Sequence, residues 1–433
     1  MKLFWPLFLE MFFVMLAGTV DTLMLSSEGD LAVGAVGTAN SYMSIIINLF
    51  NIGGTGMVAT MSYYIGAGKR QVAHSARNIG LVFNGALGGI FSFLFFIGTR
   101  TFLKLAGIAE SILDLTADYL SIVGSGCILN AMITIFSGHL RAFGLSKKPF
   151  QAAMVGNVVN IVLNAYFLYV KKAGVAGVAA ATVISRIVNL MLLVLWSQKL
   201  YQAPEKSNMI SNRRLFREIL KIGLPAALEN TAYVISVSIT VSIINIYDAS
   251  GFSASARSYA LTVATYTHCA SLSFGQANGI VAGWLMGEGK ADECSVCTKI
   301  SSAYSCATAL LFGSLLTLSS PLYMKSFSQN PDMQAIVTVL VAINIILELG
   351  RAVNVCYAGA LKATGDAIYP MIIVIIFGYL VGAGGTWLLC GAIGLNPAIA
   401  AFISMAADEC IRGVFMILRW RTGTWRNKGT FRL

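Results

Sequence analysis

Two carboxylates stand in the first apolar stretch of the chain. Glu10 and Asp21 both fall within Leu3–Leu25, a segment long enough to cross a bilayer. A charged side chain at bilayer depth costs roughly 2.5–3.5 kcal/mol on insertion scales, so each acid needs a function or a partner. Their 11-residue separation returns them to nearly one helix face. The pattern favours a functional role for Asp21 over a hydrogen-bonding one. It leaves both roles open for Glu10, which lies nearer the predicted cytoplasmic end.

A stripe of three amides could add to this chemistry. Asn157, Asn160 and Asn164 stand at positions i, i+3 and i+7 of a later apolar stretch, which puts them on one side of a helix. Buried amides can simply tie neighbouring helices together. Three on one stripe, in the same half of the chain as Asp21, predict instead a polar pocket.

The second half of the chain has its own candidate acids. Glu229 and Glu348 fall in apolar stretches and are candidates for binding a cation or a substrate. Arg351 follows Glu348 by about one helical turn and could neutralise it as an intrahelical ion pair. Glu229 could share a structural role with Glu10, its counterpart in the first half. A charge cluster that balances itself is expected to be structural, and its members are Asp408, Glu409 and Arg412.

The elements that carry these residues are predicted to be membrane helices. Hydrophobic residues make up 57% of the 433 positions and charged residues only 11%, against roughly 25% charged residues in an average soluble domain. About twelve apolar stretches of spanning length, separated by short polar breaks, use most of the chain. The sequence therefore predicts an all-α integral membrane protein without a sizeable soluble domain.

The net charge of +11 is explained by membrane topology. Lysines and arginines gather in alternate loops, near residues 69–77, 141–148, 213–221 and 419–432. The positive-inside rule makes this side cytoplasmic. Both termini are then predicted to be cytoplasmic, in a multi-pass protein of the plasma membrane. The expected surrounding is the lipid bilayer, and no nucleic-acid partner is expected.

The chain repeats itself at an offset of about 220 residues. The matching segments are Pro6-x-x-x-Glu10 with Pro225-x-x-x-Glu229, GAGK at 66–69 with GEGK at 287–290, and GHLRAFGLSKKP at 138–149 with GALKATGDAIYP at 359–370. Each proline is expected to open a helix, where its missing N–H costs little. The glycines are expected to let short loops reverse tightly.

Two copies of one unit define the expected architecture. Six helices per copy is an even number, so both halves enter the membrane from the same side, as a parallel repeat with a pseudo-twofold axis along the membrane normal. Residues 1–200 are expected to form an N-terminal six-helix lobe, 201–216 a cytoplasmic linker, and 217–433 a C-terminal six-helix lobe with a short basic tail. Such halves usually rock against each other to give alternating access, which favours a carrier.

No cofactor, metal site or enzyme activity is predicted from the remaining reactive residues. Cys294 and Cys297 form a lone C-x-x-C in a predicted cytoplasmic loop, without the second pair or the histidines that a zinc site needs. The histidines are interpreted as scattered along the chain, at His74, His139 and His268. No clustered catalytic set is present in the sequence.

The motifs resemble the MATE (multidrug and toxin extrusion) family, within the wider multidrug/oligosaccharidyl-lipid/polysaccharide exporter superfamily. The residues that carry the likeness are Pro6…Glu10…Val20-Asp21-Thr22, Gly66–Lys69, Arg141–Gly144 with Pro149, and the three asparagines. The resemblance covers essentially the whole chain. It implies a twelve-helix exporter of organic cations, driven by proton or sodium entry. It also implies an ion-binding acid at Asp21, and acids for cation or substrate binding in the helices of Glu229 and Glu348.

The chain departs from part of that family at Asn164. The family often has aspartate there, paired with the acid of the first helix, whereas an amide cannot take up a proton at physiological pH. One carboxylate with several amide oxygens suits a hard cation such as sodium, although Asp21 alone could still carry one proton. Na⁺ and H⁺ both stay open as the coupling ion, with a slight preference for Na⁺.

The resulting hypothesis is an antiporter, sufficient as a monomer, that exports small organic cations or drugs in exchange for inward Na⁺ or H⁺. A flippase for a lipid-linked saccharide is the nearest alternative, because it could hold the pyrophosphate with arginines. The candidate arginines are interpreted as scattered and mostly near acids or helix ends: Arg186, Arg257, Arg351 and Arg412. A lipid-modifying membrane enzyme and a non-transporting receptor are further alternatives. The missing catalytic cluster speaks against the first, and the duplicated bundle against the second.

Overall fold

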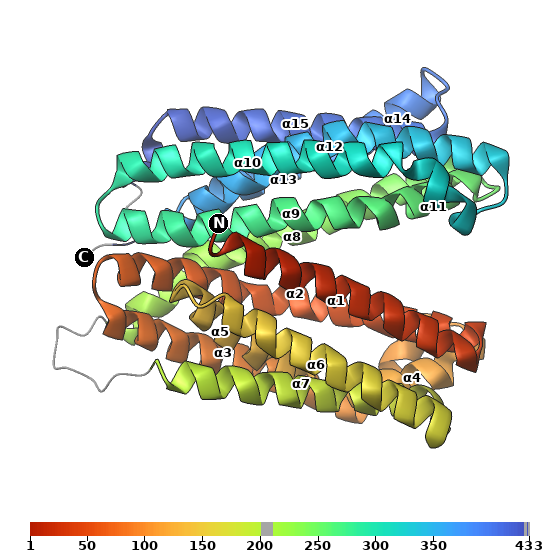
Figure 1. Ribbon diagram of the computed structural model, residues 1–433, viewed down its shortest axis with the longest axis horizontal. Helices are drawn as coiled ribbons and strands as arrows, with labels where there is room; N and C mark the ends of the chain where they lie inside the picture. The colour runs from red at the N-terminus through yellow and green to blue at the C-terminus, as the bar shows by residue number, and fades with distance from the viewer. Residues whose placement is uncertain (201–210, 428–430, 432–433) are drawn as a thin grey trace. The chain divides into compact units, whose positions relative to one another are not determined.

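The computed structural model describes residues 1–200, 211–427 and 431 of the chain. Within these residues all regular secondary structure is helical and no strand occurs, so the all-α prediction is confirmed. The chain divides into two compact units, Met1–Gly223 and Leu224–Leu433. We call them the N-lobe and the C-lobe, and their helices can be followed in Figure 1.

The N-lobe is built from α1 to α7 and the first turns of α8. The bounds are α1 Phe4–Leu25, α2 Asp30–Gly66, α3 Arg70–Leu105, α4 Glu110–Ser125, α5 Cys127–Ala142, α6 Lys147–Ala165 with a π-helical continuation at Tyr166–Val170, α7 Gly174–Gln198 and α8 Asn212–Tyr247. Helix α6 packs against both α1 and α7 (Figure 1). This packing turns the asparagine stripe of α6 towards the acids of α1.

The C-lobe is built from the rest of α8 and from α9 to α15. The bounds are α9 Phe252–Gly287, α10 Ala291–Leu318, α11 Ser320–Phe327, α12 Pro331–Ala363, α13 Ile368–Phe377, a π-helical segment at Gly378–Ala383, α14 Gly384–Gly391 and α15 Pro397–Arg421. Helix α12 packs against α9, α10 and α15. It therefore runs through the middle of the lobe.

Nine helical segments of the described chain are long and apolar enough to cross a membrane. The pair α4 and α5, bent by 45°, makes a tenth if it is one span. Helices α9 and α15 have the length of a span but are more polar, since α15 contains two acids and an arginine in its middle. Counting these two gives the predicted twelve, six from the N-lobe and six from the C-lobe.

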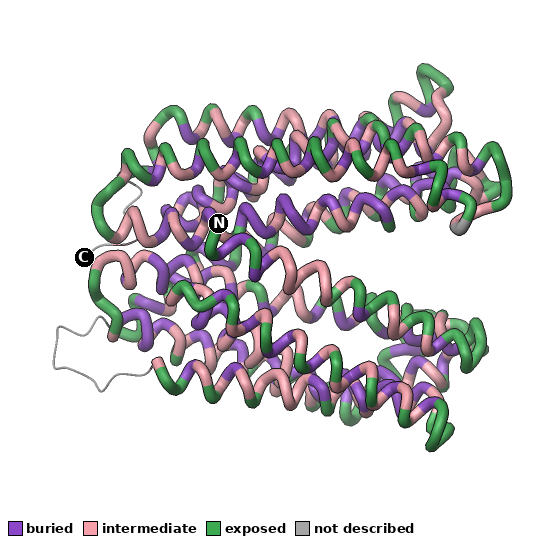
Figure 2. The backbone as a smooth tube through the Cα atoms, in the orientation of Figure 1, coloured by how far each residue is buried: buried purple, intermediate pink, exposed green. Residues whose placement is uncertain are grey.

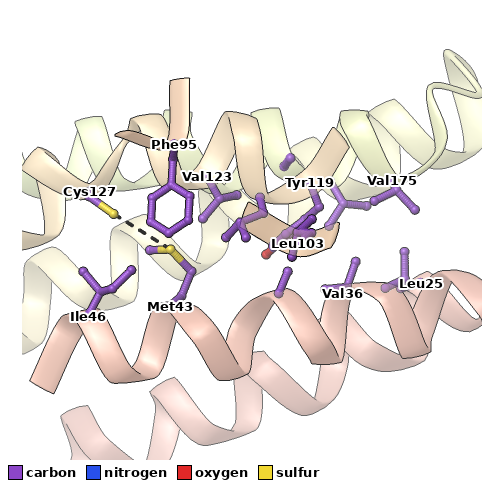
Figure 3. Packing of buried hydrophobic residues seen from close by; sticks show 14 of the residues in the cluster. Leu25, Val36, Met43, Ile46, Phe95, Leu103, Tyr119, Val123, Cys127 and Val175 are labelled. Carbon is purple, nitrogen blue, oxygen red and sulfur yellow. Dashed lines mark hydrogen bonds between the residues drawn. The ribbon is translucent and has the colours of Figure 1, made fainter. Parts of the chain in front are cut away.

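Each lobe contains an apolar core beside its polar groups. Buried residues of α2 recur every three or four positions, at Ala32, Val36, Ala39, Met43, Ile46 and Phe50. Figure 2 shows a similar recurrence along other helices, with exposed residues between the buried ones. In Figure 3 the side chain of Met43 meets Phe95 of α3 and Cys127 of α5, whose sulfur lies 3.9 Å from the Met43 sulfur.

The repeated glycine motifs are helix C-caps. Gly68 and its counterpart Gly289 have φ of 74° and 78°, a backbone region that side chains disfavour. The next amide in each case donates to a carbonyl five residues earlier, from Lys69 to Tyr64 and from Lys290 to Leu285, both at 2.8 Å. This is the Schellman pattern, which satisfies carbonyls at a helix end. The prediction of tight glycine-dependent reversals is confirmed.

Pro225 does not open a helix, contrary to the prediction. It lies inside α8, which begins at Asn212. Proline lacks the N–H that would bond the carbonyl of Lys221, so the helix loses one hydrogen bond there. Pro6 lies in the first turn of α1, as predicted.

The start of α8 belongs to the N-lobe, which moves the observed boundary beyond the predicted linker. Leu215, Ile219 and Ile222 are at most 1% exposed, and their spacing defines one apolar face. A Cβ on Gly223 would lie 1.8 Å from the Ile52 carbonyl oxygen of α2, so only glycine allows this approach. Of the predicted linker 201–216, residues 201–210 lie outside the described residues and Asn212 onward is helical.

Candidate functional site

The central polar group of the N-lobe joins α1 to α6. Asn164 Nδ2 donates to Asp21 Oδ1 at 2.9 Å. Asn160 fits its neighbours when its amide nitrogen faces Asp21, and it then donates to both carboxylate oxygens at 3.0 Å and 2.9 Å. Both amides are buried, since Asn160 is 7% exposed and Asn164 is 0% exposed. The structure thus brings together Asp21, Asn160 and Asn164.

Asp21 has no cationic partner within 4 Å among the described residues. Amide donors stabilise a carboxylate but do not cancel its charge, and an uncompensated charge in a bilayer is costly. The carbonyl oxygen Oδ1 of Asn164 is also buried without a hydrogen-bond partner. A carboxylate and an amide carbonyl oxygen are the kinds of ligand that a hard cation takes.

Asn157 has a different position from the other two amides. Its Nδ2 lies 3.4 Å from the backbone carbonyl of Phe13 on α1 and donates to it. Asn157 therefore ties α1 to α6 away from the Asp21 carboxylate. Of the three asparagines, Asn157 links two helices, and Asn160 and Asn164 contact the Asp21 carboxylate.

Glu10 is held in an ion pair rather than beside Asp21. Arg141 at the end of α5 donates to its carboxylate at 2.5 Å. The C-lobe repeats this contact, since Lys362 at the end of α12 lies 3.0 Å from Glu229. All four residues belong to the matching segments of the two halves, so the repeat preserves an ion pair between helices.

Glu348 belongs to a buried network of five charged side chains. Its carboxylate lies 2.5 Å from Arg351, which confirms the predicted neutralising pair. Arg351 also contacts Glu409 at 3.1 Å. Arg412 contacts Glu409 at 2.9 Å and Asp408 at 2.6 Å. Three acids and two arginines give a formal charge of −1, and His268 Nδ1 lies 3.9 Å from Glu348. The predicted cluster of three is therefore part of a larger group.

Arg351 and Arg412 lie near acids, as predicted, but the prediction that they are scattered is wrong. Arg351 on α12 and Arg412 on α15 both bind Glu409. Arg257 of α9 and Arg186 of α7 have no carboxylate within 4 Å among the described residues. Buried nitrogens of both lack a hydrogen-bond partner.

The histidines are also less scattered than predicted. His139 Nε2 and His74 Nδ1 lie 3.3 Å apart, and Ser197 Oγ lies 2.7 Å from the other ring nitrogen of His139. The two histidines are 65 positions apart, and nothing in their sequence spacing indicates the contact. Cys294 and Cys297 lie on α10 rather than in a loop, with free thiols. Among the described residues no group of three or more His, Cys, Asp or Glu could hold a metal ion.

Two tyrosines were not singled out from the sequence. Tyr119 of α4 is buried and its hydroxyl lies 3.5 Å from Asn40 of α2. Tyr233 of α8 accepts a hydrogen bond from Arg351 at 3.1 Å, and the Arg412 guanidinium lies 5.6 Å from its ring centroid. A lone tyrosine in an apolar stretch gives no sequence signal of such contacts.

Each lobe also widens its helix at the polar centre. The π-helical Tyr166–Val170 follows directly after the Asn160–Asn164 turn of α6. The π-helical Gly378–Ala383 carries the carbonyl of Gly378, which accepts a bond from Ser236 at 2.5 Å. Such segments are frequent at functional sites. Two repeated helical bundles with carboxylates in their membrane interior define a polytopic membrane carrier.

The MatE family model matches residues 6–167 and 225–388, so each half of the chain matches it once. The chain belongs to this family of membrane transporters, and the predicted MATE resemblance is confirmed. It is 28% identical to the uncharacterized transporter YisQ of Bacillus subtilis, over 99% of this chain and 95% of the relative. It is 24% identical to the probable multidrug resistance protein NorM of Thermotoga maritima, over 99% and 92%.

Solved structures agree with the fold. An outward-facing MATE family multidrug resistance transporter superposes with a TM-score of 0.91 at 18% identity, over 99% of this chain and 96% of that one. A superfamily transporter of Pyrococcus furiosus, described as having a binding pocket of reverse polarity, gives a TM-score of 0.85 at 17% identity, over 99% and 96%.

Proposed function

We propose that this chain is a secondary active exporter that expels organic cations or drugs in exchange for inward Na⁺ or H⁺. The observation that carries the proposal is the Asp21 carboxylate, which has amide partners but no cationic one. Such a group can be neutralised by a cation that comes and goes. A transporter needs this property in its coupling site, because a permanent ion pair would block it.

The donor set slightly favours Na⁺ over H⁺. Asp21 supplies a carboxylate and Asn164 supplies a carbonyl oxygen without a hydrogen-bond partner. Hard cations such as Na⁺ take oxygen ligands, whereas a proton needs only the carboxylate. Binding drives transport if the ion binds one conformational state more tightly than the other. By linkage, ion and substrate then favour different states or compete for the same groups.

The substrate class follows from the relatives and from the charge of the C-lobe. Relatives are named multidrug resistance proteins, and a rabbit relative is named multidrug and toxin extrusion protein 2. The C-lobe network retains one excess negative charge, so we propose that Glu348 and its neighbours attract a cationic group. Glu229 is a weaker candidate because Lys362 neutralises it. The protein is proposed to act as a monomer in the plasma membrane, with both termini cytoplasmic.

The contacts of two of the four candidate arginines disfavour the flippase alternative, whereas Arg186 and Arg257 have no carboxylate partner among the described residues. Arg351 and Arg412 would be the natural ligands of a pyrophosphate, but their guanidinium groups are bound to Glu348, Asp408 and Glu409. An anion would have to displace these carboxylates.

The test is efflux of a fluorescent organic cation from proteoliposomes with either a sodium or a proton gradient imposed. The wild type is compared with Asp21→Asn, which keeps the size of the side chain. Asp114→Asn is the matched control, because Asp114 forms an exposed ion pair with Arg100.

Efflux that follows one gradient, and is lost in Asp21→Asn but kept in Asp114→Asn, supports the proposal and identifies the ion. Folded wild-type protein that moves none of several cations under either gradient contradicts it. Undiminished coupled efflux by Asp21→Asn would move the coupling site elsewhere.

A further inference from the structure

Arg186 brings a positive charge into the N-lobe without an acid beside it. It lies in the middle of α7, and among the described residues no carboxylate lies within 4 Å of it. Its Nη1 atom is buried without a hydrogen-bond partner. A guanidinium cannot be deprotonated in a protein. Its charge is therefore a fixed feature of the lobe, and no ion pair explains why it is there.

The packing of α6 against α7 defines the level of Arg186 relative to Asp21. Gly156 of α6 lies next to Arg186, because a Cβ on it would lie 3.3 Å from the carbonyl oxygen of the preceding residue of α7. Asn160 and Asn164, which contact Asp21, lie four and eight residues further along α6, about 6 Å and 12 Å at 1.5 Å per residue. The two helices are consecutive and antiparallel. Arg186 therefore lies about one to two turns beyond the acid, towards the last residues of α7.

Tyr119 shows that the two charges face one interior. This α4 side chain is 4% exposed and interacts electrostatically with both Asp21 and Arg186. It also forms a hydrogen bond with Thr182 of α7. Thr182 precedes Arg186 by four residues, so both side chains lie on the same side of α7. The carboxylate and the guanidinium thus belong to one polar region inside the N-lobe.

The interior beyond Arg186 remains polar. Helices α5 and α7 run in the same direction, because contacts near both ends of α5 join residues about 58 positions apart, as in His139 with Ser197. This register puts Asn130 of α5 level with Asn189 of α7. The Nδ2 atom of Asn130 and the Oδ1 atom of Asn189 are buried without a hydrogen-bond partner. Polar groups of this kind line the paths that water and ions take through membrane proteins.

An apolar level follows the two amides. Leu193, one turn beyond Asn189 on α7, is 0% exposed and packs with Leu140 of α5 and Ala152 of α6. From Asp21 towards the end of α7 that is predicted to be cytoplasmic, the interior thus passes a charged level, a polar level and an apolar level.

We propose that Arg186 is an electrostatic barrier that keeps the coupling cation from passing through the N-lobe itself. The inference rests on the proposed ion coupling at Asp21 and explains why the ion leaves only with the conformational change. A carrier whose ion site leaks to the other side dissipates its gradient, and a fixed positive charge excludes cations from a path. A cation at Asp21 meets the guanidinium before any polar group further along α7. An apolar constriction blocks only while it is dry, whereas a fixed charge also repels a hydrated cation.

Ion entry in the absence of substrate tests the barrier. Full-length protein in proteoliposomes is given an inward sodium gradient or an inward proton gradient, and entry is followed with fluorescent indicators inside the vesicles. Arg186→Gln is expected to raise entry of the coupling ion by about tenfold, the effect of removing a unit charge roughly 10 Å away at an effective dielectric constant of about 20. Arg186→Lys keeps the charge and is expected to stay within about twofold of the wild type.

Two further variants separate the charge from the apolar level. Leu193→Ala opens the apolar level with Arg186 in place, so its ion entry is expected to stay within about twofold of the wild type. The double variant Arg186→Gln with Leu193→Ala is expected to leak more than Arg186→Gln alone. Trapped calcein must be retained, so that faster entry reports ion passage and not damaged vesicles. The fold of each variant is checked by its melting temperature, which loss of an uncompensated buried charge should not lower.

Folded Arg186→Gln that admits neither ion faster than the wild type overturns the proposal. A leak in Leu193→Ala as large as that in Arg186→Gln would identify the apolar level as the barrier, and an equal leak in Arg186→Lys would show that packing and not charge closes the path. Both results overturn the proposal as well. Failure of wild-type efflux under both gradients would instead concern the export function, because the leak is measured without substrate.

Discussion

The two lobes differ in the partners of the carboxylates that stand within their membrane helices. In the N-lobe, Asp21 has two amide donors and no cationic partner. In the C-lobe, Glu348, Asp408 and Glu409 are bound to two arginines at 2.5–3.1 Å. Under the proposed function the unpaired acid exchanges an ion, whereas the paired acids hold helices together at the cost of desolvation. The repeat thus keeps one architecture while the acids of its two copies have different surroundings.

The largest effect is expected from breaking the C-lobe network at its shared member. Glu409→Gln removes the carboxylate that joins Arg351 to Arg412, which then keep only Glu348 and Asp408 as partners. The free energy of unfolding is expected to fall by about 3 kcal/mol, as for weakened hydrogen bonds to a charged group, measured by thermal or denaturant unfolding of purified protein. Asp21→Asn should change it by at most about 1 kcal/mol, because no ion pair is lost. Similar stabilities for the two variants would contradict the difference between paired acids in the C-lobe and an unpaired acid in the N-lobe.

The second prediction concerns transport by the N-lobe. Asp21→Asn is expected to reduce gradient-driven efflux on the order of 100-fold, the range of a strong coupling free energy. The measurement is the initial efflux rate at matched protein content in proteoliposomes. The fold of Asp21→Asn is checked by comparing its melting temperature with that of Asp114→Asn. A slow but still gradient-dependent rate would mean that another group carries the ion.

Asn164→Asp would sharpen the contrast by adding an acid to the open site. Two carboxylates within hydrogen-bonding distance repel each other unless one takes up a proton. Efflux driven by an inward proton gradient is therefore expected to rise by roughly tenfold over the wild type, while the response to sodium falls. The two gradients are applied separately, at constant membrane potential. A larger sodium response would show that a second carboxylate simply strengthens a cation site.

The smallest effect on stability is expected for the ion pair that both lobes contain. Glu10 with Arg141 and Glu229 with Lys362 form equivalent, largely buried ion pairs. Double-mutant cycles with Gln and Met replacements should give a coupling energy of about 1 kcal/mol for each pair. The measurement is the unfolding free energy of the single and double variants. A coupling several-fold larger in one lobe would show that this pair has acquired a task of its own.

Part of the fold could be predicted from the sequence because it depends on the pattern of neighbouring residues. Apolar stretches of spanning length predict helices, and the repeat predicts two six-helix units. The glycine turns followed from the positive φ that they need. The prediction that Pro225 opens a helix was wrong because the segment before it is polar on one face and apolar on the other. That segment is helical because Leu215 and Ile219 pack against α2.

Composition, repeat and the choice of candidate residues were determined by the sequence alone. Asp21, Asn160 and Asn164 could be selected because an acid and aligned amides are costly in apolar helices. Their contact could only be decided by the tertiary structure, since Asn164 and Asp21 are 143 positions apart. The same holds for the Arg141 partner of Glu10, for the joining of Arg351 and Arg412 at Glu409, and for the level of Arg186 relative to Asp21. Whether a buried charge is paired depends on how helices rotate and pack, and no spacing along one helix specifies the side chains that its neighbours present.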